Sequence, residues 1–187
     1  MTAVRGIEES AERVLARVPE WIWDGETLPV PVEAIADDVF GLLVREVDDL
    51  AGAPGAPALG PEQSFSGLLL PSLGEIWVNR LEALEWPPRR RFTIGHELGH
   101  WCVHRNGPSD GAVYCRSASV VEEAPAASEA RPARAPEEEE ANLFAAALLM
   151  PARLVEREYR QDREFGGLCE RFDVSGAAMG RRLHKVI

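Results

Sequence analysis

A pair of histidines four positions apart, His96 and His100, constrains the fold of this chain more than any other feature of its sequence. Residues four apart lie on one face of an α-helix, about 6 Å from each other along its axis. Two imidazoles placed in this way can bind one zinc ion, each about 2 Å from the metal. The segment therefore has to be helical, and we predict a helix over residues 94–104 with Thr93 as its N-cap.

Glu97 follows the first histidine and completes the pattern His-Glu-x-x-His. Its side chain is rotated away from the direction of the histidines, so it would reach a zinc-bound water rather than the metal. Zinc acidifies the water, and a carboxylate that takes its proton leaves a hydroxide to attack a carbonyl polarised by the same ion. The motif predicts peptide-bond hydrolysis with Glu97 as the catalytic base. The alternative is a solvated helix face, but Ile94, Leu98 and Cys102 mark the opposite face as buried.

A catalytic zinc site needs a third protein ligand and an open position for water. His104 continues the histidine face but lies about 12 Å along the axis from His96, so it cannot complete the site on an unbroken helix. It should contact the ligands or lie at the surface. The better source is a second helix, predicted over residues 137–150, whose four leading glutamates suit a helix N-terminus. Glu138 is the first candidate on that helix, and Glu140 is the alternative.

Small residues would let these two helices approach each other closely. Ala141 and Ala145 lie on the second helix near the face of the proposed ligand, and Gly95 and Gly99 stand beside the histidines of the first. Glycines weaken a helix, so their presence beside two histidines indicates close packing. Asn142 shares the face of the proposed ligand and could accept the free ring N–H of one histidine, which would fix its tautomer.

The rest of the chain predicts an α+β fold in which helices pack on a small mixed sheet. Apolar residues recur at helical spacing in two N-terminal segments, and three runs bounded by glycine and proline have the pattern of strands. The last two strands should form a hairpin. The expected helices span residues 7–18 and 32–40, and the expected strands span residues 42–47, 66–70 and 75–79.

Residues 106–136 interrupt this pattern. They are rich in Ala, Pro, Ser and Glu with few large apolar side chains, so they cannot bury enough surface to order themselves, and we predict a disordered insertion. Residues 1–151 would form one metallopeptidase domain around it. Residues 152–187 should form a C-terminal helical tail with the rhythm of a helix-turn-helix, packed on that domain. Its expected apolar contacts are Leu168, Phe172, Val174, Met179 and Leu183.

The charge of the chain narrows the range of its partners. A net charge of −11 and a pI near 4.9 oppose direct binding to nucleic acid or anionic lipid as the main activity. The N-terminus has no apolar core of signal length and no later stretch is long enough to span a membrane, so we expect a cytoplasmic protein. Cys102, Cys115 and Cys169 lack the paired spacing of a thiolate zinc site and should be reduced.

Two blocks of sequence resemble the ImmA/IrrE family of metallopeptidases. The first is RFTIGHELGH at residues 91–100, where Gly95 stands in place of the usual alanine. The second is EEEANLFAAALLMP at residues 138–151, which is similar to the family signature E-x-E-A-N-x-F-A-x-x-L-L-M-P. In that pattern the first glutamate is the third ligand, and it falls on Glu138. Further matching segments are residues 28–32, residues 76–79 and the tail, so the resemblance covers most of the chain.

The resemblance implies a compact zincin fold that holds Zn²⁺ through His96, His100 and Glu138. It also implies an edge strand that pairs with the extended substrate, and residues 75–79 are the candidate because pairing there would hold the scissile bond over the zinc. Tyr114 is a candidate oxyanion donor, with a surface role as the alternative. The expected substrate is a helix-turn-helix transcriptional repressor, cleaved at one bond to relieve repression under stress or during mobile-element induction.

Two other classes of function compete with a zinc metalloendopeptidase. One is a zinc-containing regulatory module that binds a repressor without useful turnover. The presence of Glu97 favours the enzyme, because a purely structural zinc would be closed by a fourth ligand. The other is a DNA-binding regulator acting through the tail, where Arg181, Arg182 and Lys185 could meet phosphates. The acidity of the chain opposes this, so a structural or substrate-docking tail is preferred.

Overall fold

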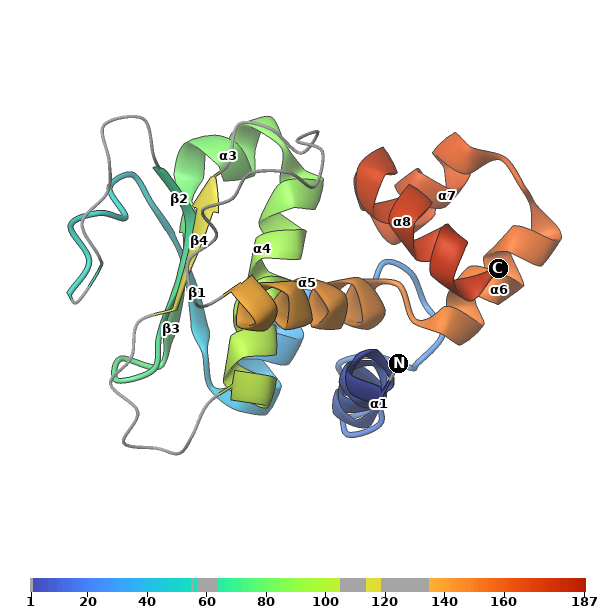
Figure 1. The fold of residues 1–187 in the computed structure, drawn as a ribbon, viewed down its shortest axis with the longest axis horizontal. Coiled ribbons are helices and arrows are strands. Elements are labelled where there is room, and N and C mark those ends of the chain that lie inside the picture. The colour runs from blue at the N-terminus through green and yellow to red at the C-terminus, as the bar shows by residue number, and fades with distance from the viewer. Residues whose placement is uncertain (1, 55, 57–63, 105–113, 119–134) are drawn as a thin grey trace.

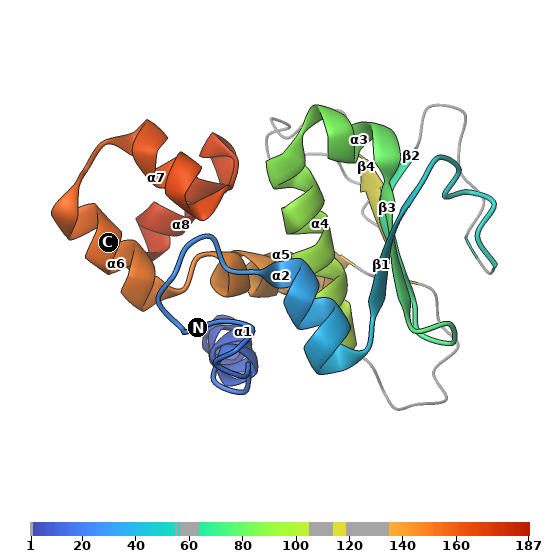
Figure 2. The same cartoon turned by 180° about the vertical axis from the view of Figure 1, so that it is seen from behind.

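The computed structural model describes residues 2–54, 56, 64–104, 114–118 and 135–187. A small sheet lies at one end of the molecule, three C-terminal helices lie at the other, and two crossing helices lie between them (Figures 1 and 2). The fold is α+β, as the sequence predicts. Within the described part of the chain, no helix is both long enough and apolar enough to cross a membrane.

The sheet has four strands in the order β1-β3-β2-β4, where three were predicted. β1 is parallel to β3, and β2 is antiparallel to both of its neighbours. The predicted hairpin of β2 and β3 is confirmed. The bounds are β1 Leu43–Val47, β2 Ser64–Leu70, β3 Glu75–Asn79 and β4 Tyr114–Ala118.

Two predictions about the sheet are wrong. Residues 75–79 are not an edge strand, because β3 has β1 on one side and β2 on the other. The alternation of buried Ile76 and Val78 with less buried neighbours reports which face is covered, and it does not report how many strands flank it.

The prediction of a disordered insertion at 106–136 is wrong for residues 114–118 and 135–136. This range contains β4, whose backbone pairs with β2, and the first two residues of the helix that begins at Ala135. The other residues of the range lie outside the described residues. Pairing along the edge of β2 satisfies the backbone hydrogen-bonding groups on the side of β4 that faces β2, and this stabilisation does not depend on large apolar side chains.

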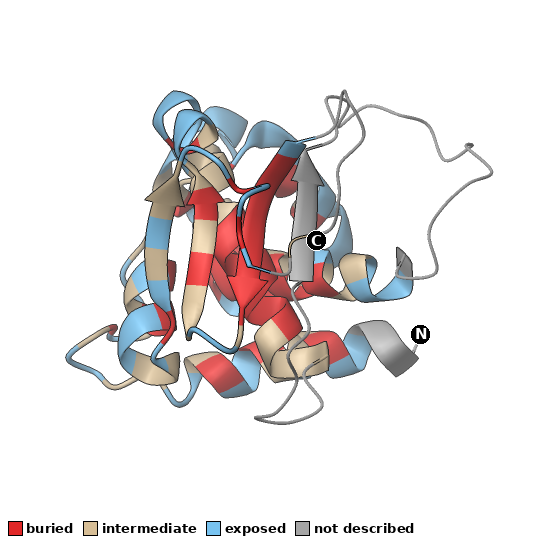
Figure 3. Cartoon of the chain, turned by 90° about the vertical axis from the view of Figure 1, so that its left-hand side faces the viewer, coloured by how far each residue is buried: buried red, intermediate tan, exposed pale blue. Residues whose placement is uncertain are grey.

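Strand β2 is buried along almost its whole length, from Phe65 to Leu70 (Figure 3). Successive side chains of a strand point to opposite faces. Leu69 accordingly joins the main core, whereas Leu68 and Leu70 join a second apolar cluster that includes Leu50. Phe65 also belongs to the second cluster, because the register shifts between Phe65 and Gly67. The strand is thus covered on both faces, and it forms a firm surface beneath the histidine helix.

The histidine helix, α4, begins earlier than predicted. Pro87 occupies its first position, where the missing N–H leaves no hydrogen bond unmade, and Thr93 is a buried residue within the helix rather than its N-cap. Two π-helical segments, η1 Ile35–Val39 and η2 His100–His104, extend α2 and α4. The bounds of the helices are α1 Thr2–Leu15, α2 Val32–Ala34, α3 Arg80–Glu85, α4 Pro87–Gly99, α5 Ala135–Leu149, α6 Ala152–Gln161, α7 Phe165–Phe172 and α8 Gly176–Val186.

Helix α5 lies at the centre of the main core. Its second half is apolar on nearly all sides, which is typical of a helix buried on all sides. Phe144, Leu148 and Leu149 are fully buried, and α5 packs against both α4 and α1. Its first half carries polar residues and points toward the sheet (Figure 1). One rigid element therefore connects the core to the region of the histidines.

The tail forms α6, α7 and α8. Asp173 adopts the left-handed conformation with φ 51° between α7 and α8, and Ser175 caps α8. Arg182, a candidate phosphate contact only under the DNA-binding alternative, is 3% exposed. Its Nε donates to the carbonyl of Met150 at 2.8 Å, and its other nitrogens bind the carboxylate of Glu8. It therefore fastens α8 to the core. The buried tail residues include Leu168, Phe172, Val174 and Met179, as predicted.

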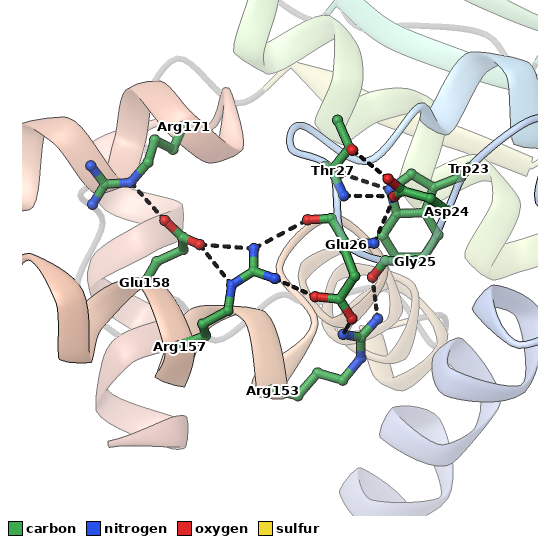
Figure 4. Close-up of polar contacts among 9 residues, drawn as sticks. All are labelled: Trp23, Asp24, Gly25, Glu26, Thr27, Arg153, Arg157, Glu158 and Arg171. Carbon is green, nitrogen blue, oxygen red and sulfur yellow. Dashed lines mark hydrogen bonds and ion pairs between the residues drawn. The ribbon is translucent and has the colours of Figure 1, made fainter.

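A polar network fastens the loop between α1 and α2 to the tail (Figure 4). The carboxylate of Glu26 bridges Arg153 and Arg157 on α6. Arg157 also donates to Glu158 at 2.8 Å, and Glu158 binds Arg171 of α7 at 3.1 Å. Because these contacts join segments far apart in the sequence, the N-terminal loop and the tail are parts of one packed unit.

Candidate metal centre

Three of the predicted ligands lie together where α4 meets α5. The Nε2 of His96 lies 3.1 Å from the Nε2 of His100 and 3.2 Å from one carboxylate oxygen of Glu138. The other oxygen of Glu138 lies 3.3 Å from the Nε2 of His100. Donors about 2 Å from a tetrahedral zinc ion stand about 3.3 Å from one another. The three side chains therefore fit a zinc ion in both chemistry and spacing.

The burial of these donors matches such a site. His96 and His100 are 1% and 0% exposed, whereas the side chain of Glu138 is 33% exposed. Burial raises the pKa of Glu138, but hydrogen bonds and attraction from His100 and His96 outweigh burial and lower that pKa to about 2. Glu138 is therefore a carboxylate at neutral pH, which is the form that binds metal.

Asn142 fixes the orientation of the first histidine. Its Oδ1 lies 3.0 Å from the Nδ1 of His96. When His96 donates its Nδ1 proton to this oxygen, its Nε2 keeps a lone pair, and that nitrogen faces His100 and Glu138. The predicted contact between Asn142 and a histidine ligand is present in the structure.

His104 and Glu140 lie together behind the second histidine. The Nδ1 of His104 is 3.0 Å from the Nδ1 of His100, and its Nε2 is 2.9 Å from a carboxylate oxygen of Glu140. The His104 side chain is 7% exposed. Glu140, the alternative third ligand, is thus placed against His104, while Glu138 faces the two Nε2 atoms. His104 contacts His100, a predicted ligand, and its side chain is not at the surface.

Glu97 is fully buried, and its carboxylate lies close to Gly67 of β2. A Cβ added at Gly67 would stand 3.1 Å from the Oε1 of Glu97 and 2.3 Å from the Cγ2 of Thr93. No side chain larger than that of glycine fits there without a shift, so Gly67 is what admits the carboxylate between helix and strand. The sequence held one signal for this role, since a glycine inside a strand often marks a close approach.

Close packing of α4 on α5 brings the predicted ligands within reach of one another. A Cβ added at Gly99 would lie 3.0 Å from the Cα of Ala141, and one added at Gly95 would lie 3.3 Å from the Cβ of Ala145. The backbones of the two helices therefore touch, as the small residues predicted. Glu138 stands one turn before Ala141, and this contact places it opposite the histidines.

Residues 74–184 match the family model of Peptidase_M78, the IrrE N-terminal-like domain. The chain belongs to this family. The suspected ImmA/IrrE resemblance is thereby confirmed, and the match supports a metallopeptidase-type function. No curated protein matches the sequence. The Peptidase_M78 match includes both helices of the candidate metal centre and most of the tail, whereas β2 with Gly67 lies before it.

Tyr114 and Cys102 are two further residues within the Peptidase_M78 match. Tyr114 is the first residue of β4, and its side chain lies outside the described part of the structure, so its role as an oxyanion donor stays a prediction. Cys102 lies within η2, and burial raises the pKa of its thiol to about 12. It is therefore a protonated thiol at neutral pH, which is a poor metal ligand.

Proposed function

We propose that this Peptidase_M78 domain is a zinc-dependent metalloendopeptidase. The observation that carries the proposal is the convergence of His96, His100 and Glu138, with Glu97 buried on the same helix as the histidines. Three protein donors leave a fourth tetrahedral position for water or substrate, whereas a structural zinc is closed by four. Within the described residues, the metal-binding cluster has these three members.

A zinc ion in this position would acidify water and polarise a peptide carbonyl. Glu97 would accept a proton from the attacking water at its carboxylate and deliver it to the leaving amine. Its burial against Gly67 restricts the rotamers of Glu97, so the carboxylate is held ready for this transfer. Asn142 keeps the Nε2 of His96 free of a proton, which preserves the ligand set.

The proposed substrate is a helix-turn-helix transcriptional repressor that is cleaved at one bond. Family resemblance supports this, and the net charge of −11 favours the approach of a basic DNA-binding protein. β4 replaces residues 75–79 as the proposed partner of the extended substrate. It is an outer strand among the described strands and it packs against α4, so pairing there would bring the scissile bond close to the histidines.

Metal analysis tests the proposed ligands. The wild-type protein should hold one zinc per chain, and His96→Ala, His100→Ala and Glu138→Ala should each lose most of it, because two donors form an incomplete shell. Glu139→Ala on the same helix is the matched control and should retain zinc. Full zinc content in Glu138→Ala would contradict the assignment of the third ligand.

Cleavage is tested by co-expression with a helix-turn-helix repressor encoded nearby. The wild type should produce one cut, and Glu97→Gln should produce none while it binds zinc normally, since the amide cannot accept the proton. Broad digestion of unfolded casein with the repressor untouched would reject the proposed substrate. Binding of the repressor by both proteins without cleavage would instead support a zinc-containing regulatory module.

A further inference from the structure

The two histidines of the candidate metal centre contact different groups through their Nδ1 atoms. His96 contacts the amide oxygen of Asn142 directly, at 3.0 Å. His100 contacts a second imidazole, that of His104, and this imidazole contacts the carboxylate of Glu140. The second arrangement is a chain of two hydrogen bonds, of 3.0 and 2.9 Å, that ends on a group carrying charge.

The carboxylate of Glu140 determines which atom donates in each of these two hydrogen bonds. An ionised carboxylate only accepts hydrogen bonds, so the Nε2 of His104 must carry the proton in its contact with Glu140. When His104 is neutral it has one N–H, on Nε2, and its Nδ1 is an acceptor. The N–H in the contact between the two rings must then belong to the Nδ1 of His100. The Nε2 of His100 is left with a lone pair, and it faces His96 and Glu138.

We propose that His104 and Glu140 are positioning residues that hold His100 in its metal-binding tautomer. The inference rests on the zinc site of the proposed function, but it concerns a different pair of side chains. His100 is 0% exposed and the side chain of His104 is 7% exposed, so bulk water is a poor substitute for this contact. An amide end group would not impose the same direction, because it offers a donor as well as an acceptor.

The π-helical segment η2 and helix α5 together create this geometry. His100 and His104 are the first and last residues of η2, and their ring centroids lie 5.1 Å apart with the planes inclined by 53°. On α5, Glu138 faces the histidine Nε2 atoms, and Glu140, two residues on, reaches His104. Helix α5 therefore supplies a ligand, the carboxylate end of the chain and the amide partner of His96.

The experiment compares Glu140→Gln and His104→Phe with Glu139→Gln. The first keeps the size of the end group but admits the reversed chain, in which the Nε2 of His100 is protonated. The second keeps a ring but removes the acceptor. The third makes the same charge change at a neighbouring residue that has no part in the chain. Zinc affinity is measured by competition with a chelator, and the protonated nitrogen of each histidine is identified by ¹⁵N NMR of the metal-free protein.

Glu140→Gln and His104→Phe should bind zinc about 10- to 100-fold more weakly than the wild type, the usual effect of removing such a partner. Glu139→Gln should match the wild type. In the metal-free wild type, His100 should carry its proton on Nδ1, and in Glu140→Gln a population protonated on Nε2 should appear. If the substitutions only destabilised the fold, they would lower the melting temperature and leave the proton of His100 on Nδ1.

Two results would overturn the inference. If Glu140→Gln binds zinc like Glu139→Gln and leaves His100 protonated on Nδ1, then the hydrogen bonds through His104 to Glu140 do not set the tautomer of His100. The proposed function would still stand. If the wild type itself does not bind zinc, both the inference and the proposed zinc site fail. Because Glu140→Gln changes no ring and little volume, the test does not depend on the stability of His104→Phe.

Discussion

Replacing Gly99 by alanine should disturb the contact on which the metal centre is built. The new Cβ would lie 3.0 Å from the Cα of Ala141 and 3.1 Å from its carbonyl oxygen. Carbon atoms pack best about 3.5–4.0 Å apart, so α4 and α5 would have to separate by about 0.5 Å. The obstacle is backbone, which cannot rotate aside as a long side chain can.

The effect on stability is the difference between two terms. Overpacking a well-packed interior costs about 1–3 kcal/mol. Exchanging glycine for alanine inside a helix stabilises the folded state by about 1 kcal/mol. Gly99→Ala should therefore destabilise the protein by about 0–2 kcal/mol. Gly95→Ala is the matched control: its closest contact would be 3.3 Å, so the helix-propensity gain should balance or exceed the packing cost.

The effect on metal binding should be larger than the effect on folding. Gly99 precedes His100, and Ala141 lies one turn from Glu138, so separating the helices pulls two donors apart. Metal–ligand distances tolerate deviations of only about 0.2 Å, which is less than the expected separation of about 0.5 Å. Urea unfolding of the metal-free protein and chelator competition for zinc measure the two effects. Equal zinc affinity in Gly99→Ala and Gly95→Ala would refute the reasoning.

Three further predictions concern the surroundings of the site. Gly67→Ala should lower both stability and cleavage. Adding Thr93→Ser should restore most of the stability, because serine lacks the methyl group that would lie 2.3 Å from the new Cβ. Urea unfolding of the single and double variants tests this. Arg182→Ala should cost about 2 kcal/mol through its lost charged hydrogen bonds, while exposed Arg181→Ala should change little; equal urea midpoints for the two would contradict the anchoring role. With the other cysteines replaced by serine, the folded protein should not react with a thiol reagent at pH 8. The pKa of Cys102 is about 12, and the thiolate is the reactive form. Unfolding the protein in urea should make Cys102 reactive.

The candidate site was largely predictable because its geometry is local. His96 and His100 stand four apart on one helix, so their convergence follows from the helical repeat alone. The approach of α5 was also foreseeable, since Gly99 and Ala141 are small. Gly67 was not recognised, because the strand that carries it meets α4 only through long-range packing.

The errors in the sheet also come from long-range contacts that a local sequence pattern does not report. A period of two in residues 75–79 identifies a covered face, but the number of neighbouring strands depends on what the rest of the chain does. β4 lies among residues whose composition is typical of disorder, and it is ordered by pairing with β2. Thr93 has the chemistry of an N-cap, yet Pro87 is equally suited to begin a helix and precedes it.

Helix α5 couples metal affinity to folding stability, because it carries residues of both the candidate metal centre and the core. Its first half bears Glu138 and Asn142, and its second half bears Phe144 and Leu148 at the centre of the core. A ligand that binds only the folded state stabilises it by about 2.7 kcal/mol when present at 100 times its dissociation constant. We therefore expect zinc, if it binds the proposed site, to rescue a chain whose core on α5 has been weakened. By linkage, a substitution at Leu148 that raises the unfolded fraction lowers the apparent affinity for zinc, although that side chain is not a metal ligand.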